Sequence, residues 1–172
     1  RSPARAATPR LRTGAAWRTM GSCSGEGYYY ETSLRAGTFL VDWFVRQICQ
    51  VPEGDSGIYK RLEADAASVP IGSHGLLTVP YWGAVMTPYW DPQARGCLVG
   101  LTGSHRLGQM YRSLLEGIAL EQALVSGMIE EQTGVRISEF IAIGGGASSD
   151  LWCQIFADAS GKAVRRSTTV EA

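Results

Sequence analysis

The chain has 172 residues, of which 45% are hydrophobic and 19% are charged, and its formal net charge is zero. This composition is that of a globular domain with its own core, and it excludes an intrinsically disordered chain. Residues 1–20 hold five arginines and no acidic residue, so the rest of the chain carries 11 basic and 16 acidic residues. A mildly acidic folded part argues against a nucleic-acid partner.

The cysteines give no sign of a metal site. Cys23, Cys49, Cys97 and Cys153 stand far apart, form no CxxC pair, and are not flanked by either histidine. Such spacing is typical of free thiols in a reducing compartment. No apolar run reaches the ~18–20 residues that a membrane span needs, and we detect no secretory signal. We therefore expect a cytoplasmic protein with no metal ligands in this chain.

The two ends suggest a piece of a longer protein. The chain begins with Arg1 and ends with Val170-Glu171-Ala172, and we expect it to start and stop inside a longer sequence. The Arg/Ala/Ser/Thr-rich opening superficially resembles an organelle transit peptide. Because a transit peptide begins at a start methionine, we favour a fragment end or non-native sequence. Residues 1–20 lack periodicity and are expected to be disordered, which leaves residues 21–172 as the domain.

Helical and strand patterns alternate along the rest of the chain. The first half predicts a strand at 27–33, a helix that begins at 37 and ends at 51–54, a helix at 57–67, a short buried strand at 76–79, an ordered loop at 80–96 and a strand at 97–101.

The second half contains the longest predicted element, a helix at 107–132. Its apolar stripe is wide, so one face should lie on a core, and Gly134 is a natural stop. A hydrophobic strand is expected at 137–143, followed by a glycine turn. Ser148, Ser149 and Asp150 can cap a further helix, which ends at Gly161 before a last strand.

The strongest local signal is this turn, Gly144-Gly145-Gly146-Ala147-Ser148-Ser149-Asp150, between a strand and a helix. Glycines let backbone N–H groups approach a ligand, and a helix start attracts an anion. Taken alone, the turn is equally compatible with a tight corner that needs positive φ. A dinucleotide fingerprint would need a third glycine where Ser149 stands, and the Gly-Lys-Ser/Thr of a Walker loop is missing.

Further segments make the sequence similar to a known family. The segments are Thr87-Pro88-Tyr89-Trp90-Asp91-Pro92-Gln93-Ala94-Arg95-Gly96 with Gly100-Leu101-Thr102, then Gln109-Met110 with Ser113-Leu114-Leu115-Glu116, then Gly144 to Trp152, and finally Val170-Glu171-Ala172. In linear order they resemble the FGGY carbohydrate kinases, which include xylulokinase, ribulokinase and glycerol kinase. Leu114 is a mild departure from the second signature.

The resemblance implies an α/β fold of the actin-like ATPase (ribonuclease H-like) class, with this chain as an incomplete C-terminal, nucleotide-binding domain. It implies transfer of the γ-phosphate of ATP, with Mg²⁺ bound mainly through the nucleotide, to a sugar or polyol hydroxyl. It places Gly144, Gly145, Gly146 and Ala147 along the adenine and ribose. Ser149 stands where glycerol kinase has an asparagine that contacts adenine, and Thr38 and Asp42 lie where other members touch the nucleotide.

The same resemblance places the catalytic base outside this chain. The family's catalytic Asp, first phosphate loop and sugar pocket precede the portion seen here, and residues 1–20 do not show the second phosphate hairpin. We therefore expect this chain to be inactive without the missing N-terminal domain. A pentulose such as xylulose is the favoured acceptor, with glycerol as the alternative. Two other functions stay open: a non-catalytic nucleotide-binding or interaction module, and a dinucleotide-dependent oxidoreductase.

Single residues with a possible chemical role have simpler explanations. His105 could contact a phosphate but suits a surface or capping position, and Asp91 and Arg95 suit bracing of their loop. Trp152 could stack on adenine, although it shares a face with core residues. The tyrosines at 28–30 alternate in direction along a strand, so packing is favoured over sugar binding.

Overall fold

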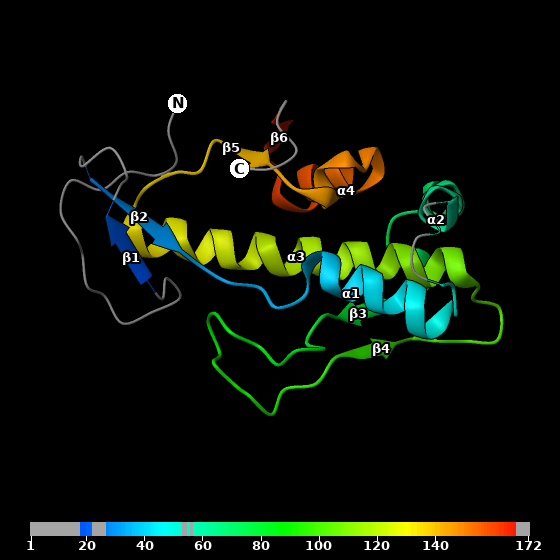
Figure 1. The fold of residues 1–172 in the computed structure, drawn as a ribbon. Helices are drawn as coiled ribbons and strands as arrows, with labels where there is room; N and C mark the ends of the chain where they lie inside the picture. The colour runs from blue at the N-terminus through cyan, green and yellow to red at the C-terminus, as the bar shows by residue number, and fades with distance from the viewer. Residues whose placement is uncertain (1–17, 22–26, 53–54, 56, 168–172) are drawn as a thin grey trace.

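The computed structural model describes residues 18–21, 27–52, 55 and 57–167. Its central element is helix α3 (Leu107–Thr133), along which the other elements lie (Figure 1). The remaining helical segments are α1 (Gly37–Trp43), its π-helical continuation η1 (Phe44–Ile48), α2 (Gly57–Ala67), α4 (Asp150–Ser160) and the short 3₁₀ turns η2 (Ser73–Gly75) and η3 (Gly145–Ser148).

Helix α3 forms where the sequence predicts it. At its start, the backbone N–H of Arg106 donates to Oε1 of Gln109 over 2.8 Å. At its end, Gly134 has a φ of 68°, the left-handed conformation that commonly terminates helices. The buried apolar side chains along it are Tyr111, Leu114, Leu115, Ile118, Ala119, Val125 and Ile129.

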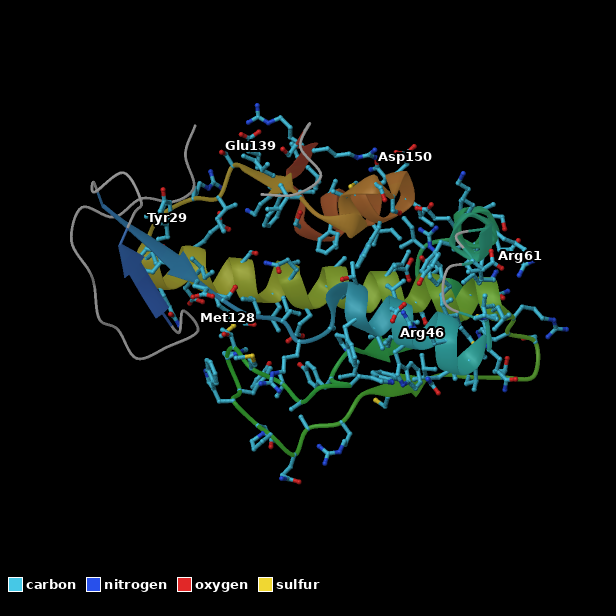
Figure 2. All side chains as sticks on the ribbon, in the orientation of Figure 1. Tyr29, Arg46, Arg61, Met128, Glu139 and Asp150 are labelled. Atoms are coloured by element: carbon cyan, nitrogen blue, oxygen red, sulfur yellow. The ribbon has the colours of Figure 1, made fainter. Side chains whose placement is uncertain are left out.

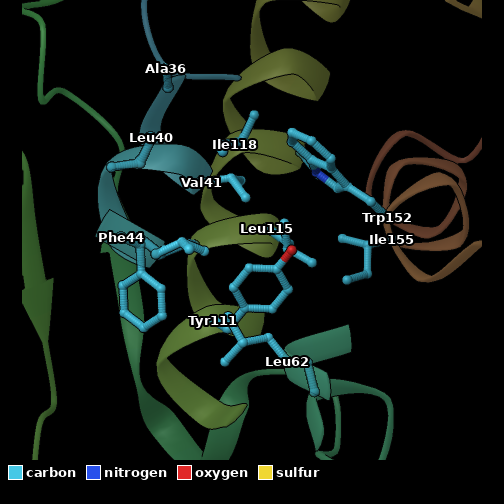
Figure 3. Close-up of a cluster of buried hydrophobic side chains, with 14 of the residues drawn as sticks. Ala36, Leu40, Val41, Phe44, Leu62, Tyr111, Leu115, Ile118, Trp152 and Ile155 are labelled. Carbon is cyan, nitrogen blue, oxygen red and sulfur yellow. The ribbon is translucent and has the colours of Figure 1, made fainter. Parts of the chain in front are cut away.

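The core is a cluster in which α1, α2, α3 and α4 meet (Figure 3). Leu40 of α1 and Leu62 of α2 are buried against α3. Phe44 packs beside Tyr111, with ring centroids 6.1 Å apart. Each such buried side chain contributes about 1.5–3 kcal/mol through removal of apolar surface from water, so this junction stabilises the relative positions of the four helices.

Three two-stranded sheets surround the helices. In the described part of the chain, β1 (Arg18–Gly21) pairs antiparallel with β2 (Tyr28–Glu31), β3 (Leu77–Val79) pairs antiparallel with β4 (Cys97–Val99), and β5 (Glu139–Ala142) pairs parallel with β6 (Ala163–Arg166). The parallel pair is joined through α4, which is the β-α-β connection expected of an α/β fold.

The expectation that residues 1–20 are disordered is wrong for residues 18–20. They belong to β1, where Arg18 lies opposite Glu31 and Met20 opposite Tyr29. The pairing satisfies backbone N–H and C=O groups and needs no side-chain periodicity, so the sequence pattern did not reveal it. Residues 1–17, and the Ser22–Gly25 part of a predicted loop, lie outside the described residues.

The strand before the glycine turn is shorter and less buried than the sequence predicts. It spans Glu139–Ala142, and Ile141 and the following Ile143 are 53% and 54% exposed. Parallel strands are normally covered on both faces. Among the described residues β5 pairs only with β6, so one of its edges is unpaired. The exposed side chains of Ile141 and Ile143 show that one apolar face is also open to solvent.

Close packing of α3 on β3 generates a first prediction. A Cβ added at Gly117 would lie 2.4 Å from the carbonyl oxygen of Thr78, whereas one added at Gly127 meets nothing within 4 Å. Gly117→Ala should lower the free energy of unfolding by about 1–3 kcal/mol, because the clash is with backbone. The matched change Gly127→Ala should raise it by about 0.5–1 kcal/mol. Urea unfolding of both variants measures the difference, and equal effects would contradict this packing.

The C-terminal end of α3 generates a second prediction. The Glu130 carboxylate accepts from the N–H of Ile137 over 2.6 Å and from Nζ of Lys162 over 3.0 Å, which ties α3 to the segments before β5 and β6. The Ile137 hydrogen bond, followed by Lys162, lowers the pKa of Glu130 below its usual 4.5. A lowered pKa stabilises the folded state above the unfolded-state pKa, and this stabilisation is lost as the pH falls through the folded-state pKa.

Glu130→Gln should therefore unfold at lower urea concentration than the wild type at pH 7, and the difference should shrink as the pH falls below 4.5. The exposed neighbour Glu131, changed to Gln, serves as the control and should leave the urea midpoint nearly unchanged. A Glu130→Gln deficit that is independent of pH would show that the charge is not responsible.

Candidate nucleotide-binding site

The glycine turn forms the 3₁₀ segment η3 between β5 and α4. Gly144 has a φ of 83°, which side chains rarely tolerate. A Cβ at Gly146 would lie 2.8 Å from the Trp152 ring and 3.5 Å from Cγ2 of Thr38, while a Cβ at Gly145 meets nothing within 4 Å. The first and third glycines are thus needed for local geometry. A Cβ at Gly144 also meets nothing within 4 Å, so Gly144 and Gly145 both leave open space over the backbone, and of the two only Gly145 is free of the positive-φ constraint.

Ser149 caps α4, as the sequence predicts. Its Oγ accepts from the N–H of Trp152 over 3.0 Å. The same hydroxyl donates to Oε1 of Glu63 on α2. The hydroxyl thus connects the start of α4 to α2, which lies 86 residues away in the sequence.

The start of α4 already carries negative charge. Asp150 lies in its first turn, is labelled in Figure 2, and forms an ion pair with Arg166 of β6. The Glu63 carboxylate lies beside Ser149. Acidic groups at a helix start use the favourable field of the helix dipole, and they repel a further anion. Because Arg166 balances the charge of Asp150, it is the Glu63 carboxylate that disfavours a phosphate beside Ser149, and the turn suits an uncharged group better.

Helix α1 carries the two other predicted site residues. The methyl group of Thr38 lies against Gly146, so the structure brings Thr38 to the turn. Asp42, one turn further along, is held by Arg46 through a 2.8 Å ion pair and accepts from the Tyr59 hydroxyl over 3.1 Å. The hydrogen bond from Arg46 lowers the pKa of Asp42, and burial together with Asp42 raises the pKa of Tyr59.

Two residues of α2 were missed by sequence reasoning. Glu63 contacts Ser149 and Tyr59 contacts Asp42, so α2 connects the turn to α1. Tyr59 and Glu63 are four residues apart and share one helix face, which is the only signal the sequence offered. Nothing in the spacing indicated that this face lies against the glycine turn.

Trp152 is a core residue, as the sequence analysis favours. It is buried, its ring lies 5.7 Å from that of Phe156, and it also forms the floor under Gly146. Within the described residues, its Nε1 is buried with no hydrogen-bond partner. Figure 3 shows the indole at the end of α4 that adjoins α1 and α3.

The other candidate residues have structural roles. His105 is buried, and its Nδ1 lies 3.0 Å from the N–H of Thr102. Asp91 accepts from the N–H of Gln93 over 2.8 Å, and Arg95 donates to the carbonyl of Ala94 over 2.9 Å. Asp91 and Arg95 therefore brace their loop, as predicted, and do not form a pair with each other.

Two other kinds of feature are absent from the part of the chain that the structure describes. Among the described residues no three His, Cys, Asp or Glu side chains lie close enough together to hold a metal ion. None of the described helices combines the length and the apolar character needed to cross a bilayer.

Several known proteins are similar to this chain in sequence or in structure. The chain is 36% identical over 165 residues to a glycerol kinase of Aromatoleum aromaticum, covering 95% of this chain and 31% of the relative. The crystal structure of xylulose kinase from Rhodospirillum rubrum matches with a TM-score of 0.72 and 30% identity, over 81% of this chain and 27% of that one. Plasmodium falciparum glycerol kinase with ADP matches with a TM-score of 0.73, 19% identity, and coverage of 86% and 28%.

The chain thus spans about a third of the length of these relatives. The family model described as "FGGY family of carbohydrate kinases, C-terminal domain" matches residues 4–172. The match therefore includes most of residues 1–20, which the sequence analysis placed outside the domain. The matching solved structures have the actin-like ATPase fold that the resemblance implied. The chain belongs to the FGGY family of carbohydrate kinases and corresponds to its C-terminal domain.

Proposed function

We propose that this chain supplies the nucleotide-binding half of an ATP-dependent kinase that phosphorylates a hydroxyl group of a sugar or polyol. Family membership and relatives that include glycerol and xylulose kinases support this activity for the whole protein. The observation that carries the proposal is the open backbone of Gly145, beside a capped helix and two further helices.

The residues around the turn suit the adenosine end of ATP. Gly145 allows a flat base or ribose to approach the backbone. The Glu63 carboxylate beside Ser149 favours an uncharged group over a phosphate. Thr38 lies against the neighbouring Gly146, and Ser149 caps the helix that follows the turn. When bound, ATP with Mg²⁺ on its phosphates would supply the transferred phosphoryl group.

The chemistry itself requires groups that we assign to the rest of the protein. Phosphoryl transfer needs a base near the acceptor hydroxyl and donors on the phosphates. We place the base, the sugar pocket and the first phosphate loop in an N-terminal domain, and expect this chain alone to be inactive. A pentulose such as xylulose stays the favoured acceptor, with glycerol as the alternative.

The activity is tested on a fusion protein. In it, this chain is joined to the part of an FGGY kinase that the chain does not cover, about two-thirds of the family length. ADP release is measured with xylulose, ribulose and glycerol as acceptors. Release that depends on one acceptor supports the kinase. Nucleotide binding without acceptor-dependent release would favour the non-catalytic module instead.

A prediction concerns Gly145. Calorimetric titration of the chain with ATP should show weak binding, because half of the cleft is missing. Gly145→Val should raise the Kd at least tenfold, since a Cβ there meets no protein atom within 4 Å and the added side chain would occupy the open space over the turn.

The control is Gly127→Ala, at an exposed position of α3 where an added Cβ also meets nothing within 4 Å. Its Kd should match that of the wild type. Equal Kd values for wild type and a folded Gly145→Val would place the nucleotide elsewhere. Absence of binding by the wild type would count against the site.

Ser149 generates a further prediction that separates stability from binding. Ser149→Ala should lower the free energy of unfolding by about 1 kcal/mol, because the cap to Trp152 is lost. Ser149→Asn should retain most of the capping and add an amide that can pair with adenine, so ATP should bind more tightly than to the wild type. Chemical unfolding and calorimetry on both variants provide the two readouts, and weaker ATP binding by Ser149→Asn would contradict an adenine at this position.

A further inference from the structure

The hydroxyl of Ser149 is held by two protein groups, and one of them fixes the position of its proton. Its Oγ accepts from the N–H of Trp152 over 3.0 Å. The same oxygen donates its single proton to Oε1 of Glu63 on α2. Because a carboxylate only accepts hydrogen bonds, the hydroxyl has to be the donor in this contact. Glu63 therefore sets the orientation of the Ser149 hydroxyl.

One lone pair of the Ser149 oxygen is left for a ligand. A hydroxyl has one proton and two lone pairs. The proton is directed to Glu63, and one lone pair receives the N–H of Trp152. Ser149 is only partly buried, and the neighbouring Ser148 is exposed, so a ligand can reach this part of the chain. Toward such a ligand Ser149 can accept a hydrogen bond but cannot donate one.

The contact between Glu63 and Ser149 is anchored in the core from both sides. Leu62, which precedes Glu63, is 1% exposed and belongs to the same buried cluster as Trp152 (Figure 3). Trp152 in turn lies in the first turn of the helix that Ser149 caps. None of the ion pairs between described residues involves Glu63, so no cation draws its carboxylate away from the serine. The hydroxyl orientation is therefore a fixed property of the folded domain.

We propose that Glu63 is a positioning residue that makes Ser149 select a purine with an amino group at position 6, an assignment that rests on the proposed function. In that function the adenine of ATP lies beside Ser149. The 6-amino group of adenine is a hydrogen-bond donor and matches the free lone pair of the serine oxygen. The 6-oxo group of hypoxanthine or guanine is an acceptor, so two oxygens would face each other with no proton between them.

The test compares ATP with inosine triphosphate (ITP). The two nucleotides have the same ribose and the same triphosphate, and ITP carries a 6-oxo group where ATP carries a 6-amino group. Calorimetric titration of the whole chain in the presence of Mg²⁺ should give a Kd for ITP that is about tenfold higher than the Kd for ATP.

Glu63→Gln should reduce this ratio of Kd values to about two or less, mainly through tighter binding of ITP. The glutamine amide can donate to the Ser149 oxygen, which frees the hydroxyl proton to reach the 6-oxo group. Loss of the negative charge acts on both triphosphates equally, so it cancels in the ratio. A purely structural role of Glu63 would weaken the binding of both nucleotides and leave the ratio unchanged.

Two further variants complete the comparison. Asp65→Asn removes the same charge from an exposed position of the same helix and should keep the tenfold ratio. Ser149→Ala removes the hydroxyl and should lower the ratio through weaker binding of ATP. Urea unfolding verifies that each variant is folded.

Equal Kd values for ATP and ITP in the wild type, or an unchanged ratio in folded Glu63→Gln, would overturn the role of Glu63 and leave the nucleotide site in place. Failure of the wild type to bind either nucleotide would overturn the proposed function itself.

Discussion

The structure depends on the burial of one long helix from two sides. The apolar stripe of α3 is covered by α1, α2 and α4, and its opposite side lies on β3. Gly117 makes the second contact possible, because any side chain there would meet the backbone of Thr78. On that side Oγ1 of Thr78 and Oγ of Ser113 are hydrogen-bonded over 2.9 Å, so the polar groups between helix and strand are satisfied. With both sides fixed, α3 serves as the frame on which the glycine turn is placed.

The packing of α4 on α3 fixes the position of the candidate site. The turn η3 directly precedes α4, and α4 is anchored to α3 through Trp152 and Ile155. Because Gly146 rests on the Trp152 ring, the turn cannot move without disturbing the core. A site of this kind is held by packing rather than by a flexible loop, which favours a preorganised binding surface.

The sequence predicted those parts of the molecule that depend on local rules. Helix limits at Gly57, Leu107, Gly134 and Gly161 followed from spacing and from left-handed glycines, and the cap at Ser149 followed from its position before an apolar face. Contacts between segments that are far apart in the chain could not be predicted from the sequence. The contact of Ser149 with Glu63 arises only when distant segments fold together. Likewise β1 depends on pairing with a later strand, a feature that no local pattern records.

The charges around the turn are compatible with the proposal that it binds a nucleotide and does not itself perform chemistry. A general base near neutral pH needs a raised pKa and a free oxygen toward its substrate. Asp42 has the reverse: Arg46 lowers its pKa, and both Arg46 and Tyr59 contact its carboxylate. Glu63 accepts from Ser149, and Asp150 is paired with Arg166. Each acid near the turn is therefore engaged in holding α1, α2 or α4 in place. The base for a reacting hydroxyl would therefore come from another part of the protein. This agrees with the proposal that nucleotide binding and catalysis lie in different halves.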